Sequence, residues 1–202
     1  MLLYLLQGLT LGFSAAASPG PFQAYLLSQT LKNGWRRTLP AALAPLLSDG
    51  PIIGLVLLAL TQTPSWFLKM LQITGGLFLL YLARGAYWDS KTADFTQQVT
   101  EEPVQQSLLQ ATLVNALNPN PYIFWSVVAG PILLEGWRQS ARLGMSFVIG
   151  FYGTLISGFA GFILLFASAR RLDPRLSRIL SGISAIALFA FGLYQLWLGI
   201  TR

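Results

Sequence analysis

The sequence contains no cysteine and no histidine, and only 10% of its 202 residues are charged. Without cysteine there is no disulfide bond, no thiol nucleophile and no thiolate metal ligand. Without histidine, the commonest metal ligand and the usual general base near neutral pH are missing as well. Soluble domains carry about 25% charged residues. The low charge, together with a hydrophobic fraction of 54%, predicts an integral membrane protein.

Apolar runs without charge follow one another along the whole chain. A transmembrane helix needs about 20 apolar residues. The runs predict an all-α protein with six transmembrane spans, at residues 3–29, 38–61, 66–88, 108–134, 141–168 and 179–199. The long polar stretch 89–107 is then a linker between one three-helix unit, 1–88, and a second, 108–202, within a single transmembrane domain.

Basic residues are divided unevenly between the two sets of loops. Nine lie in the first, third and fifth loops, whereas four lie on the opposite side. Because Lys and Arg favour the cytoplasm, the linker is expected inside and both termini outside. The net charge of +6 is therefore interpreted as topology and not as nucleic-acid binding, since no loop is long enough to form such a domain. The first segment lacks a basic n-region and stays apolar beyond "SAAAS", so we expect it to be retained and not cleaved as a signal peptide.

One motif occurs twice. "SPGPF" at 18–22 is echoed by "NPNPY" at 118–122, and "NGWRR" at 33–37 by "EGWRQ" at 135–139, each Gly-Trp-Arg in the loop that follows its span. Three spans separate the copies, so the second copy is inverted. Two inverted three-helix repeats with broken helices, here the first and fourth, are typical of transporters with a substrate site at mid-membrane. The alternative is chance, because proline often only kinks a membrane helix.

Each Pro-x-Pro removes backbone donors from the middle of a predicted span. Carbonyls at about residues 15–17 then lose their helical partners and become acceptors for a cation or an ammonium group. Pro21 and Pro121 suit the first turn of a new half-helix, whose N–H groups favour a carboxylate, and Ser18 and Asn118 are candidate N-caps. Candidate substrate-binding residues are Ser18, Pro19, Gly20, Pro21, Asn115, Asn118 and Pro119, with Tyr25, Tyr122 and Tyr152 as candidate rim contacts or ordinary packing residues.

Asp49, in "SDGP", is the only ionisable residue near the centre of a predicted span. A charged aspartate there costs about 2.5–3.5 kcal/mol. Its carboxyl group can be neutral when the site is dry and charged when it is wet, which suits proton coupling or pairing with a substrate ammonium. The alternative is a protonated structural residue that bonds a carbonyl freed by Pro51 or by the first break. The second repeat has no acid at the corresponding place.

Small residues recur at helical spacing in two other segments. Gly8 and Gly12 form one pair, and Gly153, Ser157 and Gly161 form a stripe. Both patterns let helices approach closely. We expect them to hold the bundle together, with a homodimer contact as the alternative.

The motifs "SPGP", "SDGP" and "NALNPNP" together resemble the LysE/RhtB family of amino-acid exporters over essentially the whole chain. The resemblance implies export of an amino acid or related small molecule across the prokaryotic cytoplasmic membrane, driven by protons and without a cofactor. The residues that match the motifs of the family, and to which its functional positions carry over, are Pro19, Gly20, Pro21, Asp49, Asn118 and Pro119. This sequence departs from the family pattern at one point. A lysine is expected after Asn-Pro, but Asn120 and Pro121 follow here.

Three other functions are weighed against export. A metal-cation exporter needs soft Cys or His ligands or several hard oxygens, and Asp49 is the one carboxylate at depth. An intramembrane enzyme lacks His, and no lysine lies at depth to activate a serine. We therefore expect no catalytic residue and no metal site. A scaffold without transport leaves the repeated breaks and Asp49 unexplained.

Overall fold

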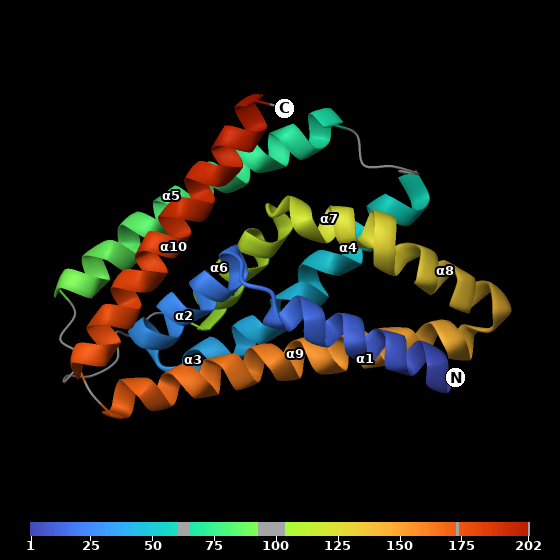
Figure 1. Cartoon of the computed structure of the whole chain (residues 1–202), viewed down its shortest axis with the longest axis horizontal. Helices are drawn as coiled ribbons and strands as arrows, with labels where there is room; N and C mark the ends of the chain where they lie inside the picture. The colour runs from blue at the N-terminus through green and yellow to red at the C-terminus, as the bar shows by residue number, and fades with distance from the viewer. Residues whose placement is uncertain (60–64, 93–103, 173, 202) are drawn as a thin grey trace.

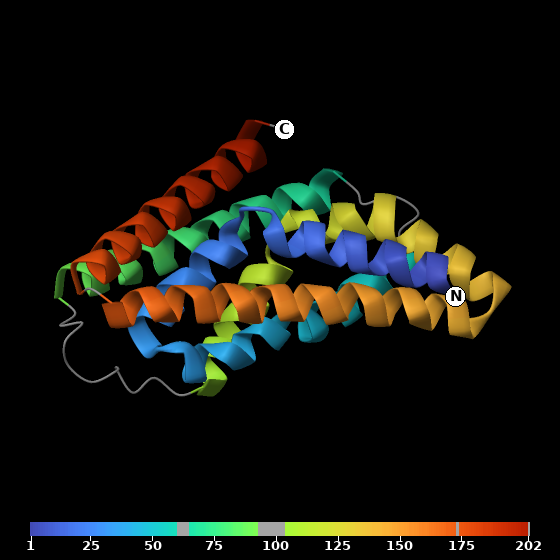
Figure 2. The same ribbon diagram turned by 60° about the horizontal axis from the view of Figure 1, so that its bottom comes forward.

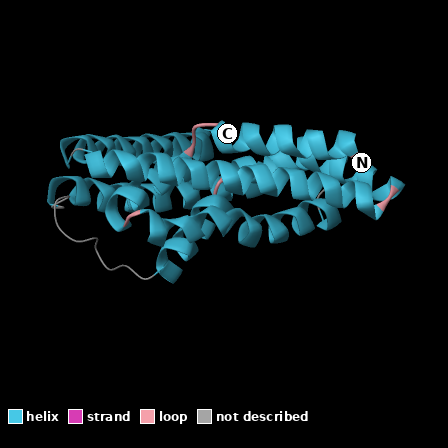
Figure 3. Ribbon diagram, turned by 90° about the horizontal axis from the view of Figure 1, so that it is seen from below, coloured by secondary structure: helices cyan, strands magenta, loops and turns pink. Residues whose placement is uncertain are grey.

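In its described part, the chain folds into a bundle of helices (Figures 1 and 3). The computed structural model describes residues 1–59, 65–92, 104–172 and 174–201, and every regular element within them is helical. The elements are α1 (Leu2–Ala17), α2 (Pro21–Asn33), α3 (Trp35–Thr38), the 3₁₀ segment η1 (Leu39–Leu43), α4 (Ala44–Ala59), α5 (Ser65–Thr92), α6 (Val104–Ala116), α7 (Pro119–Phe124), the π-helical segment η2 (Trp125–Ala129), α8 (Gly130–Gln139), α9 (Ala141–Leu172) and α10 (Pro174–Thr201).

Four of the helical segments are long and apolar enough to cross a membrane. They are Trp35–Val56, Ser65–Trp88, Ala141–Ser168 and Leu176–Thr201, and each overlaps one of the predicted spans. The other two predicted spans, 3–29 and 108–134, fall on helices that are interrupted, at 18–20 and at 117–118. Leu2–Ala17 is apolar but shorter. The chain is thus an all-helical membrane protein in its described part.

The predicted linker 89–107 is shorter than expected at both ends. Helix α5 continues to Thr92, and α6 already begins at Val104. Residues 93–103, and residues 60–61 at the end of the second predicted span, lie outside the described residues.

Two pairs of long helices frame the molecule, α1 with α9 and α5 with α10 (Figures 1 and 2). Glycines bring each pair into backbone contact. A Cβ atom on Gly8 or Gly12 would overlap the carbonyl oxygens of Phe147 or Phe151 on α9. These glycines thus hold the bundle together, as expected. The stripe on α9 behaves differently, because a Cβ atom at Gly153 or Gly161 would meet nothing within 4 Å.

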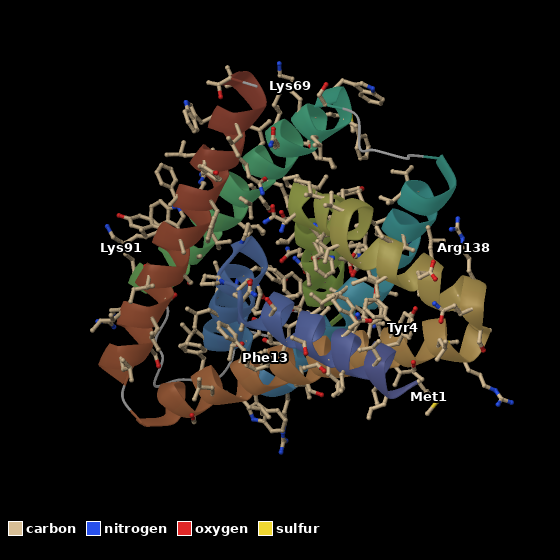
Figure 4. The ribbon with its side chains drawn as sticks, turned by 45° about the vertical axis from the view of Figure 1, so that its right-hand side comes forward. Met1, Tyr4, Phe13, Lys69, Lys91 and Arg138 are labelled. Atoms are coloured by element: carbon tan, nitrogen blue, oxygen red, sulfur yellow. The ribbon has the colours of Figure 1, made fainter. Side chains whose placement is uncertain are left out.

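The α5–α10 pair is joined in the same way. A Cβ atom on Gly76 would lie 2.8 Å from the carbonyl oxygen of Gly192, and one on Gly192 would lie 3.0 Å from that of Gly76. A methyl group on either helix would therefore separate the pair. Lys69 and Lys91 mark the two ends of α5 (Figure 4).

The two Gly-Trp-Arg motifs have different structures, which corrects their assignment to equivalent loops. Gly34 adopts φ 76° and makes the turn between α2 and α3. Gly136 lies inside α8, and its Cβ atom would be 2.9 Å from the ring of Tyr4. The second glycine therefore serves close packing, and the chain turns only at Ser140, which is extended with φ −168°.

Candidate functional site

Asp49 is buried in α4, with only 4% of its surface exposed. It lies two residues before Pro51, which supplies no N–H to the helix. Asn115 donates from Nδ2 to Asp49 Oδ1 at 2.8 Å. Tyr152 Oη donates to Asp49 Oδ2 at 3.1 Å, and Trp125 Nε1 approaches the same oxygen at 3.4 Å. Among the described residues, the side chains that donate to this carboxylate are all neutral.

These donors come from three different elements. Asn115 lies in the last turn of α6, and Tyr152 lies within α9. Trp125 opens η2, where the helix widens to i→i+5 bonding before Pro131. Such wide turns occur often at functional sites because they reorient side chains within a continuous helix. Asn115 Nδ2 also donates to Ser48 Oγ at 2.7 Å, which fixes its amide between two residues of α4.

At the first break, α1 ends at Ala17 and α2 begins at Pro21. Gln23 reaches back and donates from Nε2 to the carbonyl oxygens of Ala16, at 3.2 Å, and Ala15, at 3.4 Å. The carbonyls that proline deprives of helical partners are thus covered by a side chain from the next helix. Ser18 is not an N-cap, because its hydroxyl donates to Ser14 O at 2.7 Å. Gly20 occupies the cap position, so no side chain caps α2.

At the second break, α6 ends at Ala116 and α7 begins at Pro119. Asn118 is the N-cap, and its Oδ1 accepts from the N–H of Asn120 at 3.1 Å. The carbonyl of Leu117 packs against Gly75 of α5 so closely that a Cβ atom there would overlap it. The second break is therefore capped and fixed against a neighbouring helix.

Both breaks and Asp49 line one cavity of about 270 Å³. It brings together seven of the residues predicted from the sequence: Ser18, Pro19, Gly20, Pro21, Asp49, Asn115 and Asn118. Asp49 is the only charged residue among those that line it. The cavity thus combines one acid with amide groups and with backbone at two helix ends.

The remaining predicted residues do not line this cavity. Pro119 is buried at the start of α7. Tyr25 is fully buried and donates to Ser107 O at 2.8 Å. Tyr122 donates to Ala116 O at 2.9 Å and packs edge-on against Phe67. Tyr152 reaches the site through its bond to Asp49.

Aromatic side chains form the other wall of the cavity. Phe22 and Phe159 pack with ring centroids 4.8 Å apart, and Trp125 and Phe151 with centroids 5.4 Å apart. Neither this wall nor the roles of Gln23 and Trp125 were predicted. A signal existed for Gln23, because it is the first amide side chain after the break and lies close enough in sequence to reach the freed carbonyls. None existed for Trp125, which lies 76 residues from Asp49.

Comparisons with known proteins cover nearly the whole chain. The model of a family described as LysE type translocator matches residues 13–199. The chain is 25% identical over 200 residues to a Bacillus subtilis (strain 168) protein named "Putative amino acid efflux protein YcgF", covering 96% of this chain and 95% of the relative. No solved structure matches the chain.

Proposed function

The chain belongs to the LysE type translocator family, which is a family of transporters and not of enzymes. We propose that it exports an amino acid or a related small zwitterionic metabolite. The observation that carries the proposal is the shared cavity, where both helix breaks meet a single buried carboxylate. The name of the Bacillus subtilis relative, an amino acid efflux protein, supports the same substrate class.

The cargo has two charged ends, and the cavity offers a different partner for each. Its ammonium group pairs with Asp49, the one charged residue of the lining. Its carboxylate binds the first-turn N–H groups of α2, where the cap position is a glycine and no side chain competes. The start of α7 is less suited, because Asn118 already accepts from the N–H of Asn120.

Proton coupling follows from competition for the same carboxylate. A proton on Asp49 and the ammonium of the cargo exclude each other, since both neutralise one charge in a buried site. The donors Asn115, Tyr152 and Trp125 hold the empty carboxylate in place between the two loaded states. Export of cargo is thereby linked to import of a proton.

Alternating access in this protein rests on six spans arranged as two inverted three-helix repeats, 1–88 and 108–202. In this arrangement α1 with α2 forms the first span, and α6 with α7, η2 and α8 forms the fourth. The positive-inside rule places the turn at Gly34 in the cytoplasm and both termini outside the cytoplasmic membrane.

A metal-cation exporter is the competing function. A hard cation needs several oxygen ligands, usually more than one carboxylate. Within the described residues no group of three His, Cys, Asp or Glu side chains is close enough to hold a metal ion. The cavity itself supplies one carboxylate. The amino-acid proposal therefore fits the donors better.

The test is a transport screen in proteoliposomes. Purified protein is reconstituted, each proteinogenic amino acid is loaded in turn, and efflux is followed with and without an inwardly directed proton gradient. We expect at least one amino acid to leave faster when the gradient is present. If no amino acid moves faster than in protein-free vesicles, proteinogenic amino acids are excluded as the cargo.

Asp49→Asn tests the role of the carboxylate in coupling. The asparagine keeps the size of the side chain but cannot hold the charge, so the gradient should no longer accelerate efflux. Glu135→Gln is the matched control, because it removes an exposed acid on α8 that bonds only Gln139 among the described residues. Equal gradient dependence in Asp49→Asn and wild type would refute the coupling role.

A further inference from the structure

One wall of the cavity that holds Asp49 is apolar. Its large side chains are Phe22, Phe124, Trp125, Phe151, Leu155 and Phe159. Three of them, Phe151, Leu155 and Phe159, follow the i, i+4, i+8 spacing of one face of α9. We call these three residues the α9 stripe. Eight residues of α-helix span about 12 Å, so the stripe is long enough to accompany a whole small molecule.

The α9 stripe extends between the two proposed partners of the cargo. At one end, Tyr152 follows Phe151 in sequence and donates to Asp49 Oδ2 at 3.1 Å. At the other end, Phe159 packs against Phe22 in the first turn of α2, with ring centroids 4.8 Å apart. A cargo whose ammonium lies at Asp49 and whose carboxylate lies at the start of α2 therefore has its side chain beside the stripe.

The polar side chains that line the cavity are engaged with the chain itself. Gln23 and Ser18 donate to carbonyl oxygens of α1. Asn115 donates to two residues of α4, and Asn118 accepts from the first turn of α7. The remaining lining amide, Asn120, is exposed. A polar cargo side chain would thus find few partners here, whereas an apolar one gains from contact with the wall.

A second charge on the cargo would also lack a partner. Asp49 is the only charged residue among the described residues of the lining, and the cargo ammonium already neutralises it. Ring faces can hold a cation in place of an acid. Here, however, Phe151 stacks with Phe124, with centroids 5.5 Å apart, and Trp125 with Tyr152, at 6.4 Å. Part of the aromatic face is thus taken, and ring edges carry positive partial charge.

We propose that the cargo is an α-amino acid with an uncharged, apolar side chain, which the α9 stripe selects. This inference rests on the proposed export function and specifies which amino acids the cavity accepts. The cavity volume of about 270 Å³ agrees with a single small cargo, since pockets for drug-sized ligands occupy roughly 300–1,000 Å³. Lysine and glutamate are excluded by their second charge.

The first test measures binding to the full chain in detergent and requires no transport. The ligands are glycine, alanine, 2-aminobutyrate, norvaline and norleucine, which differ by one carbon at each step. Each Kd is obtained from the rise in melting temperature with ligand concentration. We expect Kd to fall about fourfold per added carbon until the cavity is full, as burial of one methylene predicts. A Kd that is independent of chain length would overturn the proposal.

Matched pairs of ligands test the exclusion of a second charge. Lysine is norleucine with an ammonium group on its last carbon, and glutamate is norvaline with a carboxylate in place of its last methyl group. We expect each charged ligand to bind at least tenfold more weakly than its apolar counterpart. Lysine that binds as tightly as norleucine would show that the rings hold a cation and would overturn the proposal.

Variants of α9 connect the preference to the stripe. In Leu155→Ala, norleucine should bind about fourfold more weakly, because its last carbon loses its contact, whereas alanine should bind as before. Leu165→Ala is the matched control on the same helix, because this side chain is 65% exposed and does not line the cavity. Phe159→Leu provides the same readout if Leu155→Ala does not fold. Equal weakening of alanine and norleucine in the stripe variants would overturn the selection by the stripe.

The outcomes separate this inference from the proposed function. Binding that strengthens with chain length, in a protein that exports no amino acid, would sustain the apolar site and refute only export. Export of lysine or glutamate in preference to norleucine would sustain export and refute only the inference. If no member of the series binds, the inference is overturned, and the transport screen still decides on export.

Discussion

The two helix breaks share a Pro-x-Pro motif but differ in how their polar groups are satisfied. At the first break, the hydrogen-bond partner comes from the next few residues of the chain, because Gln23 donates to the carbonyls of Ala15 and Ala16. The start of α2 stays uncapped, because its cap residue is Gly20. The second break is tied to its surroundings. Asn118 caps α7, and Asn115 bonds Ser48 and Asp49 of α4.

This difference assigns the breaks different tasks in the proposed transport cycle. An uncapped helix start keeps its N–H groups available for an anion, whereas a capped start has used one of them. A carbonyl packed against a glycine of another helix, as at Leu117 and Gly75, holds its break in a fixed place. In that cycle the first break would bind the cargo carboxylate, and the second break would hold its helices against α5.

The largest expected effect on stability comes from disturbing the anchor. In Gly75→Ala the new methyl group would overlap the carbonyl of Leu117 and lie 2.7 Å from Gln195 Oε1. Such overpacking costs about 1–3 kcal/mol, and we expect thermal unfolding in detergent at a clearly lower temperature. Gly85→Ala is the control on the same helix, because nothing lies within 4 Å of its Cβ position. Equal melting of the two variants would mean that the second break is not held by α5.

A smaller effect on stability, but a clear one on KM, should follow from making the first break resemble the second. Gly20 is extended, with φ −168°, and its Cβ atom would meet only the flexible end of Gln23 at 3.3 Å, so Gly20→Ser can be accommodated. The serine hydroxyl would cap α2 and compete with the cargo carboxylate. Loss of one charge-assisted hydrogen bond, about 1.5–3 kcal/mol, predicts at least a tenfold higher KM for efflux with stability unchanged. An unaltered KM would place the carboxylate elsewhere.

The smallest effect should come from removing the cap at the second break. Asn118→Ala deletes the acceptor for the N–H of Asn120, which costs about 1 kcal/mol. We expect a modest decrease in melting temperature and little change in KM, measured on the same preparations as Gly20→Ser. A large rise in KM here would reverse the tasks assigned to the two breaks.

Hydropathy was sufficient to predict the four helical segments that are long and apolar enough to cross a bilayer. It could not distinguish the two Gly-Trp-Arg motifs. One glycine is needed for a positive φ at Gly34, whereas Gly136 is needed for contact with Tyr4, and the sequence looks the same in both cases. Packing partners, not local propensity, determine the difference.

Within the candidate site, features set by local chemistry were predicted, whereas contacts between distant parts of the sequence were not. Proline chemistry indicated where backbone groups would be freed, and the cost of a buried charge drew attention to Asp49. The partners of Asp49 lie 66, 76 and 103 residues away in sequence, and only folding brings Asn115, Trp125 and Tyr152 to one carboxylate. For Tyr25 the sequence left a rim contact and ordinary packing open, and in the structure it is buried and donates to Ser107 O.

The glycine contacts between the long helices have a mechanical consequence. Gly8 and Gly12 join α1 to α9, and Gly76 and Gly192 join α5 to α10, with backbone against backbone in both pairs. Because backbone atoms cannot change rotamer to make room, neither pair can slide without a clash. Each pair therefore moves as one stiff unit. Of the two breaks, the non-helical residues 18–20 form the joint, because the second break is fixed to α5 through Leu117 and Gly75. Movement that carries cargo would then be a rotation of α1, together with α9, about the first break.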